Sequence, residues 1–125
     1  MSTTTSLITG VDFVCIPTQD FDTAVRFYGE VLGLPAGKRW GDMPAQEFQA
    51  GDVTLAVMQM DAFGQEFSAT AAPLALRVED VAAARSHLEA HGVEFHAQFD
   101  SGTCHQAVFS DPDGNTLIVH HVYGR

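Results

Sequence analysis

Histidine and cysteine are the side chains in this sequence that most readily bind a metal or act as nucleophiles. The chain has six of the first and two of the second. His120 and His121 are adjacent in an apolar, β-rich stretch, so their side chains point to opposite faces of a strand and cannot share an ion. His105 lies in the segment expected to pair with that strand. A metal site built on His105 and His120, with Glu47 as a borrowed third ligand, is therefore one hypothesis, and hydrogen-bonded or cavity-lining histidines are the interpretation we prefer.

The remaining candidates of this kind have simpler interpretations. His87 and His91 are four residues apart on an expected helix, but no general base stands between them, which favours a solvated helix flank. Cys15 and Cys104 are far apart and form no CxxC motif, so two ordinary reduced thiols are expected.

Arg77 and two aromatic side chains are candidates for ligand contact. Arg77 interrupts an otherwise apolar strand on the side assigned to the hollow, and a buried guanidinium there would require a carboxylate from either the protein or a ligand. Trp40 and Phe48 could offer a flat stacking wall, although aromatic residues on strands more often belong to a core or a dimer interface. The sequence leaves both questions open.

The elements that position these residues repeat once along the chain. Each half contains a strand, an Asp, an amphipathic helix and a Gly. Asp20 and Asp80 are expected to cap the helices, and Gly33 and Gly92 to end them in a left-handed conformation. The apolar stripes are Ala24, Phe27, Tyr28, Val31 and Leu32 in the first helix and Val81, Ala84 and Leu88 in the second.

Strands account for most of the rest. They are expected at 37–40, 46–50 and 53–60 after the first helix, and at 93–100, 104–110 and 116–123 after the second. The segment DPDGN at 111–115 predicts a hairpin between the last two strands. The prediction is one α+β domain spanning 1–125, made of two tandem βαβββ modules that form a curved mixed sheet around a cavity. Module one covers about 8–60, a linker covers 61–72, and module two covers about 73–123.

Alternation along the first strand of each module predicts which side chains face the cavity. Val14 and Ile16 are expected to pack against a helix, whereas Phe13 and Cys15 face the hollow. The second module repeats this pattern, with Leu74, Leu76 and Val78 toward the helix and Pro73, Ala75 and Arg77 toward the hollow.

Composition limits the class of partner. Of 125 residues, 46% are hydrophobic and 18% charged, and the formal net charge is −10. So acidic a surface repels phosphate backbones and anionic lipids, which argues against nucleic acid and membrane partners and favours cationic ones. The sequence shows neither an apolar run of about 20 residues nor a signal peptide, and a cytoplasmic location is expected.

Two segments resemble a known superfamily. The segments QDFDTAVRFYGEVLGL and FSDPDGNTLIVHH are similar to the first-helix signature and the last hairpin of the glyoxalase, bleomycin-resistance and extradiol dioxygenase proteins, also called vicinal oxygen chelate proteins. Enzymes of that group hold a divalent metal with four side chains, and the resemblance places those positions at Phe13, about Leu55, Pro73 and Ile118. None of these four side chains can bind a metal.

The resemblance therefore implies a metal-free, cofactor-free protein of the bleomycin-resistance type, a homodimer that binds an apolar or cationic small molecule. The alternative is a divalent-metal-dependent lyase, isomerase or dioxygenase with a rearranged ligand set around His105 and His120, and a hollow filled by its own side chains is a third hypothesis. The residues expected to contact a ligand are Phe13, Cys15, Trp40, Phe48, Leu55, Arg77, His105, Ile118 and His120.

Overall fold

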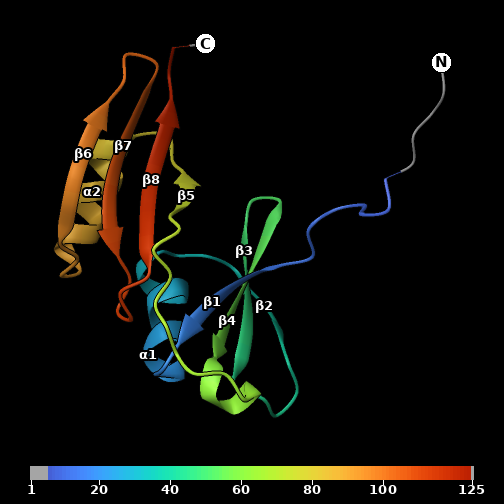
Figure 1. The fold of residues 1–125 in the computed structure, drawn as a ribbon. Helices are drawn as coiled ribbons and strands as arrows, with labels where there is room; N and C mark the ends of the chain where they lie inside the picture. The colour runs from blue at the N-terminus through green and yellow to red at the C-terminus, as the bar shows by residue number, and fades with distance from the viewer. Residues whose placement is uncertain (1–5, 125) are drawn as a thin grey trace, which may run out of the picture.

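The computed structural model describes residues 6–124 and has the predicted α+β architecture of two tandem modules (Figure 1). The first module contains β1 (Val14–Thr18), α1 (Phe21–Arg26), the π-helical turn η1 (Phe27–Val31), β2 (Ala36–Arg39), β3 (Ala45–Ala50) and β4 (Val53–Gln59). A 3-10 turn, η2 (Met60–Phe63), follows it. The second module contains β5 (Leu74–Arg77), α2 (Val81–Ala90), β6 (Phe95–Asp100), β7 (Cys104–Ser110) and β8 (Thr116–Val122).

The strands form two four-stranded mixed sheets with matching topology. The strand order is β1-β4-β3-β2 in sheet A and β5-β8-β7-β6 in sheet B. In each sheet the first and last strands of the module run parallel, and the remaining neighbours are antiparallel. Cys15 pairs with Ala56 in sheet A as Ala75 pairs with Ile118 in sheet B, which gives a residue-by-residue correspondence between the modules.

Both helix starts and both helix ends follow the expected chemistry. The carboxylate of Asp20 accepts a hydrogen bond from the amide of Thr23, and Asp80 accepts one from Ala83. These bonds satisfy exposed donors of the first helical turn. After the helices, Gly33 and the corresponding glycine of module two have φ of 72° and 86°, a conformation that glycine adopts without steric cost.

The first helix differs from expectation in its second half. After Arg26 it widens into a π-helical turn, in which the amide of Leu32 bonds to the carbonyl of Phe27 five residues back. Phe27 and Tyr28 are both buried within this turn. A π turn shifts the following side chains around the helix axis, so the apolar stripe read at ordinary helical spacing could not show it.

One hydrophobic core lies between the sheets and their helices. It includes Ile16, Tyr28, Phe48, Leu55 and Val57 from module one, and Val81, Leu88, Phe109, Leu117 and Val119 from module two. In Figure 1, α2 covers one face of sheet B and leaves the other face toward the viewer without a helix. The uncovered face of each sheet is the side that the repeat analysis assigned to the hollow. No helix within residues 6–124 is long and apolar enough to cross a membrane.

Candidate ligand-binding face

The uncovered face of sheet A carries the side chains of Cys15, Glu47 and Ala56. The register places Cys15 on β1 and Glu47 on β3 opposite Ala56 on the central strand, so the three stand side by side. Their neighbours along each strand point to the helix side, where Ile16, Phe48 and Val57 are buried. We call the surface formed by Cys15, Glu47, Ala56 and the aromatic residues around them the open face of sheet A.

Glu47 is held by an indole. The Nε1 of Trp40 donates a hydrogen bond to Oε2 of Glu47 at 2.7 Å, and both side chains are half-buried. This bond orients the carboxylate on the open face without neutralising it. The ion pair found within residues 6–124 joins Arg85 and Glu89 on α2. No Lys, Arg or His nitrogen of this range lies within 4.0 Å of the Glu47 carboxylate. The negative charge of Glu47 is therefore available to a cation.

The indole that binds this carboxylate belongs to a cluster of three aromatic rings. The ring of Phe13 packs edge-to-face on Trp40 with centroids 5.1 Å apart, and Phe63 packs on Trp40 in the same way at 6.3 Å. Phe13 keeps 40% of its surface exposed, so the cluster is open to solvent on one side. Phe63 belongs to η2, inside the segment expected to be a plain linker. Its only sequence signal is an aromatic residue in the short apolar stretch MDAF directly after β4.

Cys15 supplies a thiol next to the aromatic cluster. Its Sγ lies 3.9 Å from the Sδ of Met60, and partial burial raises its pKa above the ordinary value of a thiol. A thiol that is harder to ionise is a weaker nucleophile at neutral pH. The role of Cys15 as a small apolar residue on this face stays a prediction.

Phe48 and Leu55 do not lie on the open face, contrary to their selection as ligand contacts. Both point to the helix side, where Phe48 is 1% exposed and packs on Tyr28, and Leu55 is fully buried. The register also corrects the fourth metal-ligand position. Because Ile118 corresponds to Ala56 and not to Leu55, the four positions read Phe13, Ala56, Pro73 and Ile118.

These four side chains do not fit a divalent metal, because phenyl, methyl, pyrrolidine and sec-butyl groups offer no lone pair. Within the described part of the chain, no group of three or more His, Cys, Asp or Glu side chains is arranged to hold an ion.

Sheet B places three of the selected residues on its uncovered face. Ile118 pairs with Ala75, and His120 pairs with Arg77 across the parallel strands, so these side chains share one side. His121 lies on the other side, where its Nδ1 is 3.0 Å from the carbonyl of Val78. The prediction that His120, and not His121, faces away from the helix is confirmed by this register.

His105 does not approach His120, and the rearranged metal site built on the two is wrong in its geometry. Across β7 and β8, His105 pairs with His121, whereas His120 pairs with Gln106. His105 and His120 are therefore on opposite faces of sheet B. The sequence could not show this, because the offset between the two strands depends on the exact length of the DPDGN turn.

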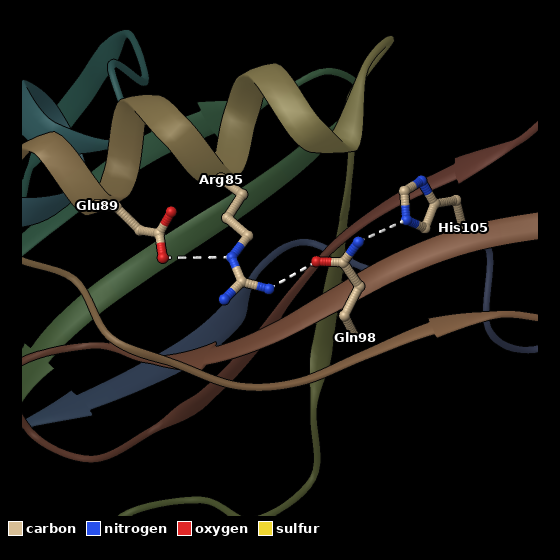
Figure 2. Close-up of polar contacts among 4 residues, drawn as sticks. All are labelled: Arg85, Glu89, Gln98 and His105. Carbon is tan, nitrogen blue, oxygen red and sulfur yellow. Dashed lines mark hydrogen bonds and ion pairs between the residues drawn. The ribbon is translucent and has the colours of Figure 1, made fainter.

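His105 instead ends a chain of polar contacts next to α2 (Figure 2). Glu89 pairs with Nε of Arg85 at 3.3 Å, and Nη1 of Arg85 donates to Oε1 of Gln98 at 2.6 Å. The amide nitrogen of Gln98 then contacts Nε2 of His105 at 3.0 Å. Because the Gln98 oxygen is committed to Arg85, this contact favours the His105 tautomer with a bare Nε2. All four side chains lie at the surface or near it, which is typical of a structural surface network.

The paired βαβββ modules and their uncovered sheet faces define a class of proteins. The sequence profile of the Glyoxalase/Bleomycin resistance protein/Dioxygenase superfamily matches residues 10–119. The chain belongs to this superfamily, as its two signature segments indicated.

Solved structures show the same fold. TnmS3, an antibiotic binding protein from Streptomyces sp. CB03234, is 25% identical, with a TM-score of 0.78 over 95% of this chain and 100% of the other. A glyoxalase/bleomycin resistance protein/dioxygenase from Nocardioides is 22% identical, with a TM-score of 0.71 over 94% and 86%. Lactoylglutathione lyase from Agrobacterium tumefaciens is 16% identical, with a TM-score of 0.74 over 93% and 96%. No curated protein matches the sequence significantly.

Proposed function

We propose that this protein binds a small organic cation with an apolar body on the open face of sheet A and sequesters it without chemical change. The observation that carries this proposal is the Glu47 carboxylate, which is free of a protein cation within residues 6–124 and is bonded at 2.7 Å to Trp40, a member of the aromatic cluster. Aromatic faces attract cations through their quadrupole, and a desolvated carboxylate adds a direct ion pair.

Charge and family support the same ligand class. A formal net charge of −10 raises the local concentration of cations around the protein. The similar structure of TnmS3 is that of an antibiotic binding protein, so this fold also serves binding. The metal-dependent enzyme that the sequence left as an alternative has no comparable observation in its favour, because its two histidines lie on opposite faces of sheet B.

We further propose that a homodimer in the cytoplasm is the working form. On the open face of sheet A, Phe13 is 40% exposed, and on the uncovered face of sheet B, Phe99 is 57% exposed. A second copy that covers these faces would enclose the ligand and remove apolar surface from water. The free thiols Cys15 and Cys104 suit a reducing compartment.

Binding can be tested with the cation of 4-phenylbutylamine and its uncharged analogue 4-phenylbutan-1-ol. Trp40 is the only tryptophan of the sequence, so its fluorescence reports directly on the site, and calorimetry gives the affinity. The cation is expected to bind about tenfold or more tightly than the alcohol, and Glu47→Gln to abolish this preference, since a charge-assisted contact contributes about 1.5–3 kcal/mol.

The matched control removes a carboxylate elsewhere. Glu66→Gln changes the net charge by the same amount at an exposed residue outside the open face and should leave binding unchanged. Equal affinity for the cation and the alcohol, or a loss of the same size in Glu66→Gln, would show that bulk charge and not Glu47 selects the ligand.

A further inference from the structure

A cavity lies between the two modules, away from the open face of sheet A. Its volume is about 500 Å³, in the range of small-molecule sites. The walls come from Leu34, from Leu55 on β4, from the turn between β3 and β4 with Gly51 and Asp52, and from the whole of β5, Leu74–Arg77. Leu55 points to the helix side of β4, so this cavity and the open face lie on opposite sides of sheet A.

The cavity follows the free edge of β5. Consecutive residues of a strand point to opposite faces, so one cavity can touch all four residues Leu74–Arg77 only by lying against the strand's edge. Within the described chain β5 pairs with β8 alone. Alternate backbone N–H groups of β5 consequently point toward the cavity with no strand partner, and they can donate hydrogen bonds to a ligand.

The guanidinium of Arg77 is the cationic group beside these apolar walls. Nη2 of Arg77 lies 3.9 Å from the place that a Cβ on Gly51 would occupy, so the guanidinium reaches past the strand edge to the β3–β4 turn. Arg77 has no carboxylate within 4.0 Å in residues 6–124, and Asp52 on the same rim does not pair with it. A guanidinium without a protein partner above Leu34, Leu74 and Leu76 matches a molecule with an anionic head and a hydrocarbon body.

The hydrocarbon body of such a molecule has room to extend beyond this cavity. A smaller cavity of about 190 Å³ shares Leu34, Leu76 and Arg77 with the first and continues between η1 and α2 toward Leu88 and Val119. A free inorganic anion would leave these walls in contact with water, whereas an alkyl or aryl chain would cover them.

We propose that this cavity binds an apolar carboxylate, such as a medium-chain fatty acid or an aryl-alkanoic acid, with Arg77 and the free edge of β5 holding the carboxylate. The site is separate from the cation site proposed on sheet A. The protein therefore has two binding sites of opposite charge preference.

The test uses sodium octanoate and the uncharged octanamide, followed by calorimetry and thermal unfolding. Octanoate is expected to bind and to raise the melting temperature, and octanamide to bind about tenfold or more weakly, because it lacks the charge-assisted contact. Arg77→Gln should lower octanoate affinity to the level of octanamide. Lys38→Gln, which removes an exposed cation outside the cavity, should leave octanoate affinity unchanged.

A second variant is expected to raise octanoate affinity, a result that misfolding cannot produce. Asp52→Asn removes from the rim of the cavity a negative charge that repels the octanoate carboxylate, and it should tighten octanoate binding. The proposal is overturned if wild-type protein does not bind octanoate, if Arg77→Gln binds it as wild type does, or if octanamide binds equally well. Loss of octanoate binding in Glu47→Gln but not in Arg77→Gln would also overturn it, because the acid would then occupy the open face of sheet A.

Discussion

The hydroxyl of Tyr28 donates a 2.7 Å hydrogen bond to Oδ2 of Asp111, and both residues are buried although they belong to different modules. Asp111 opens the DPDGN hairpin, and its carboxylate also accepts bonds from the amides of Asp113 and Asn115. Asn115 in turn donates to the carbonyl of Pro17 on β1. The hairpin that is most recognisable in the sequence thus also makes polar contacts that join the two modules.

Tyr28→Phe should lower the free energy of unfolding by about 1–2 kcal/mol, because Asp111 keeps its other donors but loses one charge-assisted bond. Urea unfolding followed by far-UV circular dichroism measures the change. Tyr123→Phe is the matched control: its hydroxyl bonds to Asp100 at an exposed position, and its removal should change stability less. If both variants lower the free energy of unfolding equally, the buried contact between modules contributes no more to stability than the exposed hydrogen bond of Tyr123.

Tyr28 should also make stability fall at alkaline pH. Burial, together with the neighbouring Asp111 carboxylate, raises the pKa of Tyr28 above its ordinary value near 10. Above that value the unfolded chain releases the proton while the folded protein keeps it. Stability is therefore unaffected below about pH 10 and declines above it, by about 1.4 kcal/mol per pH unit for one group. Urea titrations from pH 9 to 11 should show a steeper decline for wild type than for Tyr28→Phe, and parallel curves would contradict the assignment.

The fold could be predicted because its signals are local. Asp20 and Asp80 cap helices, and the DPDGN turn sets φ values, through contacts within a few residues. The π turn at Phe27 could not be predicted in this way, because helical periodicity assumes the spacing that the turn breaks. The short helix η2 was missed since only four residues form it.

The site was predicted only where alternation along one strand suffices. Phe13, Cys15 and His120 were placed on uncovered faces correctly, because side chains alternate between the two faces along each strand. Leu55 and His105 were misplaced, because their positions depend on the offset between strands, and an error of one residue moves a side chain to the other face. The bond between Trp40 and Glu47 joins neighbouring strands and has no local signature.

Cys15 should respond to a ligand on the open face of sheet A. In a Cys104→Ser background it is the only thiol, and its raised pKa predicts alkylation by iodoacetamide several-fold slower than that of the unfolded chain at pH 8. Saturating 4-phenylbutylamine should slow the reaction further, as mass spectrometry can measure, whereas 4-phenylbutan-1-ol should not. Labelling at the unfolded rate, or protection by the alcohol alone, would place the ligand elsewhere.

Phe99→Glu should convert the proposed homodimer into a monomer. Phe99 pairs with Gln106, which pairs with His120, so its ring lies on the uncovered face of sheet B, and 57% of it is exposed in the single chain. A carboxylate there would be buried without a partner in the dimer, at a cost of several kcal/mol. Sedimentation velocity over a range of concentrations measures the assembly. Ala82→Glu on the exposed side of α2 is the matched control and should remain dimeric. A wild-type protein that sediments as a monomer, or a Phe99→Glu variant that stays dimeric, would show that this face is not the interface.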